Sequence, residues 1–210
     1  MSYTTHKKNI KIVADVVCPW CFIGCNYLNA SLKSRNFYKY EIDWQPFYLN
    51  PTMPSNGIDR KLYLKNKFGS QVNLIESQIL NAAENYNIKI NLEKINTTPN
   101  TRKIHSAISI IKKHNLNKSY DFAFKIMTDY FANGKDIRNE TYLTKTIAKF
   151  NTHNKHITFG NINNTENKEP FLNFDFINGV PVFIFNDKWT LNGAQAPKVI
   201  ETIIDIAAKH

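Results

Sequence analysis

The sequence has little cysteine, no long apolar run and no cluster of basic residues, and each absence excludes a class of protein. Its three cysteines lie within eight positions of one another, whereas a secreted disulfide framework spreads an even number along the chain. No apolar run approaches the roughly 18 residues that cross a bilayer, so we expect no membrane partner. A cleavable signal peptide is not expected, because the short apolar stretch 10–17 is interrupted by Lys11 and Asp15 and runs directly into the first cysteine. These features predict a cytoplasmic protein.

The formal net charge of +10 raises nucleic acid as a partner, but the basic residues are dispersed. No run of Lys and Arg is longer than two residues, and no basic–aromatic repeat is present. We therefore interpret the charge as a solvated surface without a dedicated nucleic-acid site. The 210 residues, 42% hydrophobic and 21% charged, are typical of one large globular domain or of one domain with an inserted subdomain.

The most informative motif is Cys18-Pro19-Trp20-Cys21, at the exit of an apparent strand. Two cysteines at this spacing can close a disulfide and open it again. A helix N-terminus favours the thiolate form of a cysteine, because unpaired backbone N–H groups and the helix dipole face it. The thiolate is the attacking species in thiol–disulfide exchange. We predict that Cys18 is the nucleophile and that the more buried Cys21 is the resolving thiol, with Pro19 and Trp20 shaping the backbone and the apolar cover between them.

Two other interpretations of the motif stay open: two packing cysteines, and half of a zinc site. A zinc site normally needs a second pair of ligands. Cys25 could supply a third ligand, but no second CxxC and no HxxxH follows, so we expect no metal. Cys25 lies on the same helix face as Cys21 and is interpreted as a core residue, because this spacing has poor geometry for a disulfide.

The spacing of apolar residues predicts an α/β protein. At the start, residues 10–17 and 40–49 indicate strands, and residues 22–32 indicate a helix between them. In the middle, helices are predicted over 60–68, 71–86, 101–115, 119–132 and 141–150, followed by a loop over 159–170. At the end, strands are predicted over 180–185 and 189–191 and a helix over 197–208.

This order predicts a thioredoxin-like fold with an inserted helical subdomain. Residues 1–52 and 165–210 would form the split thioredoxin-like domain, and residues 53–164 an inserted all-helical subdomain. In such a fold, Pro181 at the start of a strand occupies the place of a cis-proline facing the dithiol, which leaves the Val180 backbone free to pair with an extended substrate. Only about 5–6% of X–Pro bonds are cis, so a trans proline at a strand entrance is the alternative.

Two further residues are candidate participants near the dithiol. His105, in a predicted helix, is a candidate proton shuttle or a simple partner of a backbone group. Asp15, three residues before Cys18, is a candidate proton acceptor for the resolving thiol, or equally a satisfied polar residue at the sheet edge.

With these pieces placed, the chain resembles the cytoplasmic, FrnE-like branch of the DsbA family. The matching stretches are residues 15–24, 47–54, Asn100-Thr101 with His105, 130–131 with 134–137, 179–183 and 193–195. The resemblance implies a thioredoxin fold with an inserted helical domain, Cys18 and Cys21 as the redox pair, and Pro181 as the cis-proline. The chain departs from the family pattern at Cys25, where a basic or polar residue is expected, and it lacks the auxiliary C-terminal cysteine pair of some relatives.

The sequence therefore predicts a disulfide oxidoreductase that acts on protein or small-molecule thiols and disulfides without a bound cofactor. Glutathione stays open as an external redox partner. One alternative is a glutathione-dependent enzyme similar to 2-hydroxychromene-2-carboxylate isomerase or the kappa-class transferases, although that branch lacks the CxxC. A non-enzymatic metal-binding module is the other alternative. A monomer and a homodimer are equally open.

Overall fold

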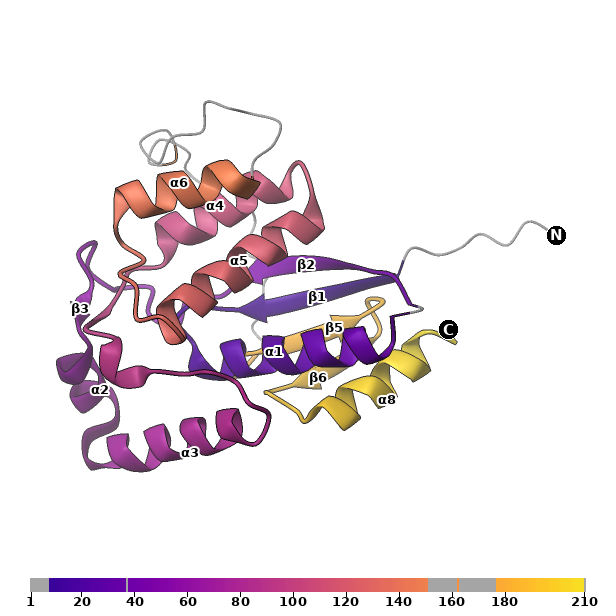
Figure 1. Cartoon of the computed structure of the whole chain (residues 1–210), viewed down its shortest axis with the longest axis horizontal. Helices are drawn as coiled ribbons and strands as arrows, with labels where there is room; N and C mark the ends of the chain where they lie inside the picture. Colours follow the sequence, from indigo (N-terminus) through magenta and orange to yellow (C-terminus); the bar gives the residue numbers. More distant parts are fainter. Residues whose placement is uncertain (1–7, 37, 151–161, 163–176, 210) are drawn as a thin grey trace.

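The computed structural model describes residues 8–36, 38–150, 162 and 177–209. Its centre is a four-stranded mixed sheet with the order β2-β1-β5-β6 (Figure 1). β1 (Lys8–Ala14) pairs in parallel with β2 (Tyr40–Pro46) and antiparallel with β5 (Val182–Phe185), which pairs antiparallel with β6 (Trp189–Asn192). The first and last parts of the described chain thus meet in one sheet.

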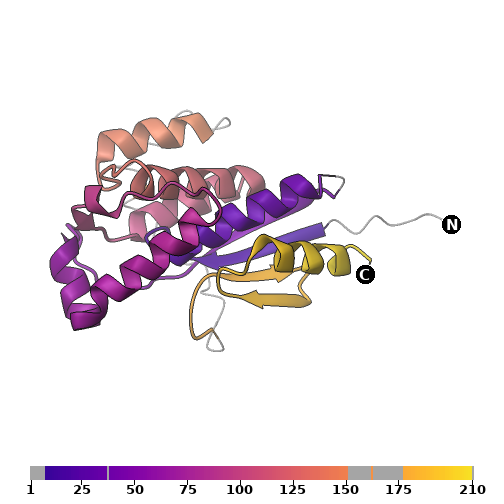
Figure 2. The ribbon, with the colours of Figure 1, turned by 60° about the horizontal axis from the view of Figure 1, so that its bottom comes forward.

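Helices surround this sheet. α1 (Pro19–Ser34) connects β1 to β2, and α8 (Pro197–Ala207) follows β6. Between β2 and β5 lie β3 (Ile58–Asp59), α2 (Arg60–Phe68), a 3-10 turn (Gly69–Gln71), α3 (Val72–Glu84), a second 3-10 turn (Leu92–Lys94), β4 (Thr97–Thr98), α4 (Arg102–Lys112), α5 (Leu116–Phe131) and α6 (Glu140–Phe150). α1 and α8 lie side by side along the sheet, and α5 packs against α1 and β2 (Figures 1 and 2).

The core is built on β1, which pairs with β2 on one side and with β5 on the other. Ile10 and Ile12 are completely buried, as is Trp44, which lies opposite Ile12 in the β1–β2 register. Phe183 lies opposite Ile12 on the other side. The buried positions of β1 carry β-branched and apolar residues, which is why its sequence is recognisable as a strand.

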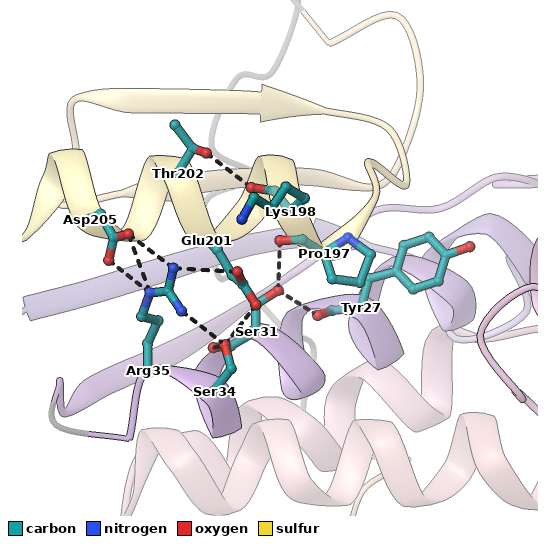
Figure 3. Close-up of polar contacts among 9 residues, drawn as sticks. All are labelled: Tyr27, Ser31, Ser34, Arg35, Pro197, Lys198, Glu201, Thr202 and Asp205. Atoms are coloured by element: carbon teal, nitrogen blue, oxygen red, sulfur yellow. Dashed lines mark hydrogen bonds and ion pairs between the residues drawn. The ribbon is translucent and has the colours of Figure 1, made fainter.

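Polar contacts attach α8 to the helix that follows the dithiol (Figure 3). The Ser31 hydroxyl oxygen lies 3.1 Å from the Pro197 carbonyl oxygen. At the end of α1, Arg35 Nε donates to Asp205 Oδ1 at 2.9 Å, and its Nη2 lies 3.3 Å from Glu201 Oε2. α8 in turn contacts β5 and β6, so these contacts help to fix the position of α1 relative to the β5–β6 hairpin.

The structure differs from the sequence-based prediction at three places. β1 ends at Ala14 rather than at residue 17, because the Asp15 carbonyl accepts the Cys18 N–H at 3.1 Å and turns the chain. β2 ends at Pro46, opposite Ala14, because its partner β1 ends there; the Phe47 N–H still donates to the Ala14 carbonyl at 3.0 Å. The segment 53–164 is not all helical, because β3 and β4 form a two-stranded pair. Strands of two residues are too short to show an alternating pattern.

The division of the chain into two domains stays a prediction. The boundary at residues 164 and 165 and most of the predicted loop 159–170 lie outside the described residues.

Candidate active site

Cys18 caps the N-terminus of α1. It has an extended backbone conformation (φ −87°, ψ 115°), and the helix begins at Pro19, where the missing N–H costs no hydrogen bond. The Cys21 backbone N–H points back to Cys18 Sγ at 3.3 Å. The three-residue spacing of the motif therefore places an unpaired donor of the first helical turn on the sulfur of the first cysteine.

Both thiols are buried, with 4% of Cys18 and 0% of Cys21 exposed. Burial raises the pKa of the Cys21 thiol well above its usual range, and the neighbouring Cys18 raises that pKa further. A hydrogen bond with the Asp15 backbone acts in the opposite direction on the Cys21 pKa. Cys21 is therefore held as a neutral thiol at neutral pH. Cys18 is the more exposed of the two cysteines, as the sequence analysis expects of the nucleophile, and Cys21 is the more buried, as it expects of the resolving thiol.

The segment that precedes β5 lies against Cys18. The Val180–Pro181 peptide bond is cis, as the sequence led us to expect. Cys18 Sγ lies 3.8 Å from the Val180 carbonyl oxygen, and the Pro181 carbonyl accepts the Gly193 N–H at 2.8 Å. Within the described residues, the Val180 backbone N–H has no hydrogen-bond partner. A backbone edge is thus presented beside the first cysteine.

A cavity of about 400 Å³ opens beside Cys18. Its walls are mainly apolar and come from the dithiol turn, the loop after β2, α2, α3 and α5; they include Val17, Pro19, Trp20, Leu49, Tyr63, Leu64, Val72, Ile75, Ile79, Phe131 and Val180. One ion pair lines it: Arg60 Nη2 on α2 lies 2.6 Å from Glu76 Oε1 on α3 and joins the two helices. We call this cavity the dithiol cleft.

A larger cavity of about 880 Å³ lies next to the cleft between α2, α3 and the second 3-10 turn. It has no cysteine in its wall, although it shares five lining residues with the cleft: Arg60, Leu64, Val72, Glu76 and Leu92. We take the smaller cavity as the candidate site, because it contains the reactive sulfur.

Asp15 and His105 are brought together, but in a buried network of their own. His105 Nε2 lies 3.3 Å from Asp15 Oδ1, and the Leu49 N–H donates to Asp15 Oδ2 at 2.9 Å. Trp44 Nε1–H, which can only donate, lies 3.4 Å from His105 Nδ1. The ring proton is therefore assigned to Nε2, from which it is donated to the carboxylate. Both imidazole nitrogens are occupied by Asp15 and Trp44.

The predicted residues thus fall into two groups. Cys18, Pro19, Trp20 and Val180 line the dithiol cleft, and Cys21 lies immediately behind Cys18. Pro181 packs on Gly24 of α1. Asp15 faces Cys21 through its backbone, whereas its carboxylate binds the loop after β2 and α4.

Sequence reasoning missed the opposite wall of the cleft. Arg60, Tyr63, Leu64 and Lys67 line it from α2, and their spacing of three and four residues marks one helix face. The periodicity was visible, but nothing in it indicates that this face meets the dithiol.

Among the described residues, no three or more His, Cys, Asp or Glu side chains are grouped so that they could hold a metal ion. No helix in the same part of the chain has the length and apolar character needed to cross a membrane.

Comparison with known proteins gives a consistent result over the whole fold. A family model described as "DSBA-like thioredoxin domain" matches residues 9–205. The uncharacterized protein YwbO of Bacillus subtilis (strain 168) is 25% identical over 203 residues, covering 93% of this chain and 95% of its own length.

Solved structures share the fold at low sequence identity. A "probable DsbA oxidoreductase" from Streptomyces coelicolor superposes with a TM-score of 0.72 at 16% identity, covering 97% of this chain and 91% of its own. The cytosolic disulfide reductase DsbM from Pseudomonas aeruginosa, solved with GSH, has a TM-score of 0.64 at 12% identity and covers 96% and 100%. A 2-hydroxychromene-2-carboxylate isomerase has a TM-score of 0.65 at 13% identity and covers 96% of each chain. At these identities, the likeness shows the fold alone.

Proposed function

Because the chain belongs to the DSBA-like thioredoxin domain family, we propose that it is a thiol–disulfide oxidoreductase that works through its CPWC dithiol. The observation that carries the proposal is the pairing of Cys18 Sγ with the Cys21 N–H at the start of α1. Val180 presents backbone groups next to the same sulfur. Together they provide a nucleophile, a resolving thiol and a place for an extended substrate.

The reaction begins with attack by the Cys18 thiolate on one sulfur of a substrate disulfide. The substrate S–S bond breaks, a Cys18–substrate disulfide forms, and the second substrate sulfur leaves as a thiolate. The first turn of α1 favours the attacking thiolate, because the Cys21 N–H and the helix dipole are directed at Sγ.

The second step is resolution by Cys21. Cys21 loses its proton and attacks Cys18 Sγ, which releases the other substrate thiolate and leaves a Cys18–Cys21 disulfide. Besides burial, the neighbouring Cys18 and its charge raise the pKa of Cys21. The contribution of that charge disappears when Cys18 is bound in the mixed disulfide, so Cys21 ionises more readily at the step that requires it. The substrate gains two electrons from the dithiol, and two molecules of an external thiol such as glutathione then reduce the Cys18–Cys21 disulfide and are themselves oxidised to a disulfide.

The size and position of the dithiol cleft support the proposal that the substrates are thiols or disulfides, either of small molecules or of extended peptide segments. Its volume of about 400 Å³ is in the range of cavities that hold small ligands. The clustering of the cysteines near one end of the sequence supports action in the reducing cytoplasm. DsbM of Pseudomonas aeruginosa, which shares the fold, is a cytosolic disulfide reductase solved with GSH, and this is consistent with glutathione as the external partner here.

The test is the reduction potential of the Cys18–Cys21 couple, measured in glutathione redox buffers by alkylation and mass spectrometry, with Cys18→Ser as the control. We expect a reversible two-electron couple that Cys18→Ser abolishes. The measured potential, compared with that of the compartment, then says whether the protein acts as a reductant or an oxidant; a difference of about 30 mV corresponds to roughly 1.4 kcal/mol. Absence of a reversible couple would refute the proposal. Glutathione-dependent activity that survives Cys21→Ser would instead favour the isomerase or transferase alternative.

A further inference from the structure

Gly24 lies where α1 passes closest to the segment that faces the dithiol. It is buried in the middle of the helix, nearly two turns after Cys18. A Cβ atom built on Gly24 would lie 3.0 Å from Pro181 Cγ, 3.1 Å from Phe183 Cζ and 3.3 Å from Phe183 Cε2. Glycine is unfavourable inside a helix by roughly 0.5–1 kcal/mol relative to alanine, so its presence here calls for a packing reason.

The neighbours of Gly24 cannot move aside easily. Pro181 is a closed ring, and its carbonyl is bonded to the Gly193 N–H at 2.8 Å. Phe183 is completely buried and lies between Ile12 on β1 and Leu191 on β6 in the sheet register. A Cβ at position 24 would therefore require α1 and the segment 180–183 to separate by a few tenths of an ångström.

Such a displacement would act directly on the reactive sulfur. Cys18 caps the helix that contains Gly24, and the two residues are six positions or about 9 Å apart along the helix axis. Val180 adjoins Pro181, and its carbonyl oxygen lies 3.8 Å from Cys18 Sγ. A wider gap at Gly24 would therefore separate Cys18 from the Val180 backbone.

We propose that Gly24 is a positioning residue: by allowing α1 to touch Pro181 and Phe183, it sets the distance between the Cys18 sulfur and the backbone of Val180 that receives the substrate. The inference rests on the proposed function, since it assigns a role in substrate alignment. It predicts that a methyl group at position 24 slows the reaction of Cys18 with an extended substrate more than it slows alkylation of the Cys18 sulfur by a small reagent.

The experiment compares two reactions of Cys18 in the wild type, in Gly24→Ala, in Phe183→Leu and in the double variant. The first is exchange with the disulfide of a short cysteine-containing peptide, which uses the Val180 backbone. The second is alkylation by iodoacetamide, assigned to Cys18 by peptide mapping, which needs only the sulfur. Ile204→Val is the control for a small loss of stability, because Ile204 is completely buried in α8 and does not line the dithiol cleft. Urea unfolding of each variant accompanies the rates.

We expect Gly24→Ala to slow peptide exchange about tenfold, the effect of losing one to two backbone hydrogen bonds, with alkylation within about twofold of the wild type. Phe183→Leu should restore part of the exchange rate in the Gly24→Ala background, because it removes the ring atoms that the methyl group would meet. If Gly24→Ala does not fold, the double variant takes its place and should show the same selective loss in weaker form.

Equal losses in exchange and alkylation, or a loss no greater than that of Ile204→Val, would overturn the role of Gly24. A wild-type protein that does not exchange with the peptide disulfide would instead overturn the proposed function. The two failures are therefore distinguishable.

Discussion

Substitution of Asp15 directly tests the buried network beside the dithiol, in which the Asp15 carboxylate contacts His105 and the Leu49 backbone. Its carboxylate accepts the Leu49 N–H at 2.9 Å and the His105 Nε2–H at 3.3 Å, and both Asp15 and His105 are 1% exposed. Asp15→Ala removes both acceptors. Each buried donor left without a partner costs roughly 1–3 kcal/mol. Leu49 is only partly buried, so water recovers some of its loss, and we expect a total destabilisation of about 2–4 kcal/mol.

The assay is urea unfolding followed by tryptophan fluorescence, with Asp136→Ala as the matched control. Asp136 is likewise a carboxylate held by a neighbouring side chain, Arg138, but its side chain is 52% exposed, so its loss should cost no more than about 1 kcal/mol. Asp15→Asn keeps one acceptor oxygen and should fall between the two. A loss below about 1 kcal/mol for Asp15→Ala would refute the view that this network holds the loop after β2 against the dithiol turn.

The Asp15→Asn variant decides between the two roles that the sequence left open for Asp15, a proton acceptor for the resolving thiol or a satisfied polar residue. A general base contributes about 10²–10⁴ in rate, so a proton acceptor for Cys21 would make Asp15→Asn resolve its mixed disulfide at least a hundredfold more slowly. The carboxylate accepts hydrogen bonds from the Leu49 and Val17 backbone N–H groups, from the Thr101 hydroxyl and from His105, and none of the printed side-chain contacts joins it to the Cys21 sulfur. We therefore expect the rate of resolution to change by less than tenfold while stability falls.

Three other predictions concern single residues. Cys21→Ser should accumulate a stable mixed disulfide on Cys18, seen by mass spectrometry; a lifetime equal to that of the wild type would contradict the role of Cys21. Cys25→Ala should leave the rate of exchange within about twofold of the wild type, because burial raises the pKa of Cys25 and keeps the thiol unreactive. The lost packing should lower the free energy of unfolding by about 1 kcal/mol. Iodoacetamide labelling of native Cys25 would be the contrary result. Burial would raise the pKa of Asp129, but hydrogen bonds led by those of Lys125 and Tyr142 outweigh it and lower that pKa from 3.8 to about 2. Because the folded-state pKa is depressed, this stability is present above pH about 4 and is lost as the pH falls toward 2; Asp129→Asn should cost about 2 kcal/mol at pH 7 and remove that acid-dependent loss from urea titrations.

The secondary structure around the dithiol could be predicted because its causes are local. An apolar, β-branched strand, a proline suited to the first helical turn and an apolar face on the following helix are all written in neighbouring residues. The contact between Cys18 Sγ and the Cys21 N–H follows from the same three-residue spacing. The family resemblance implied the same fold, and the family match over residues 9–205 agrees with it.

The wall of the cleft formed by α2 could not be predicted in the same way. Arg60, Tyr63 and Lys67 mark a helix face by their spacing, but an amphipathic pattern does not name the surface that the face covers. The two-residue strands β3 and β4 were missed for a simpler reason, since they are held by pairing with each other and have no pattern of their own.

By itself, the sequence determined the order of the elements and the presence of a dithiol at a helix N-terminus, because these depend on residues within one or two turns of each other. The predicted fold also placed Val180 and Pro181 opposite the dithiol, and Val180, 162 positions from Cys18, does lie beside its sulfur. Only the tertiary structure decided the other distant contacts: the Asp15 carboxylate is directed to Leu49 and His105, α2 forms one wall of the dithiol cleft, and Gly24 packs against Pro181. Such contacts arise when separate apolar faces pack into one core, and the packing of a whole chain is not contained in the pattern of any one segment.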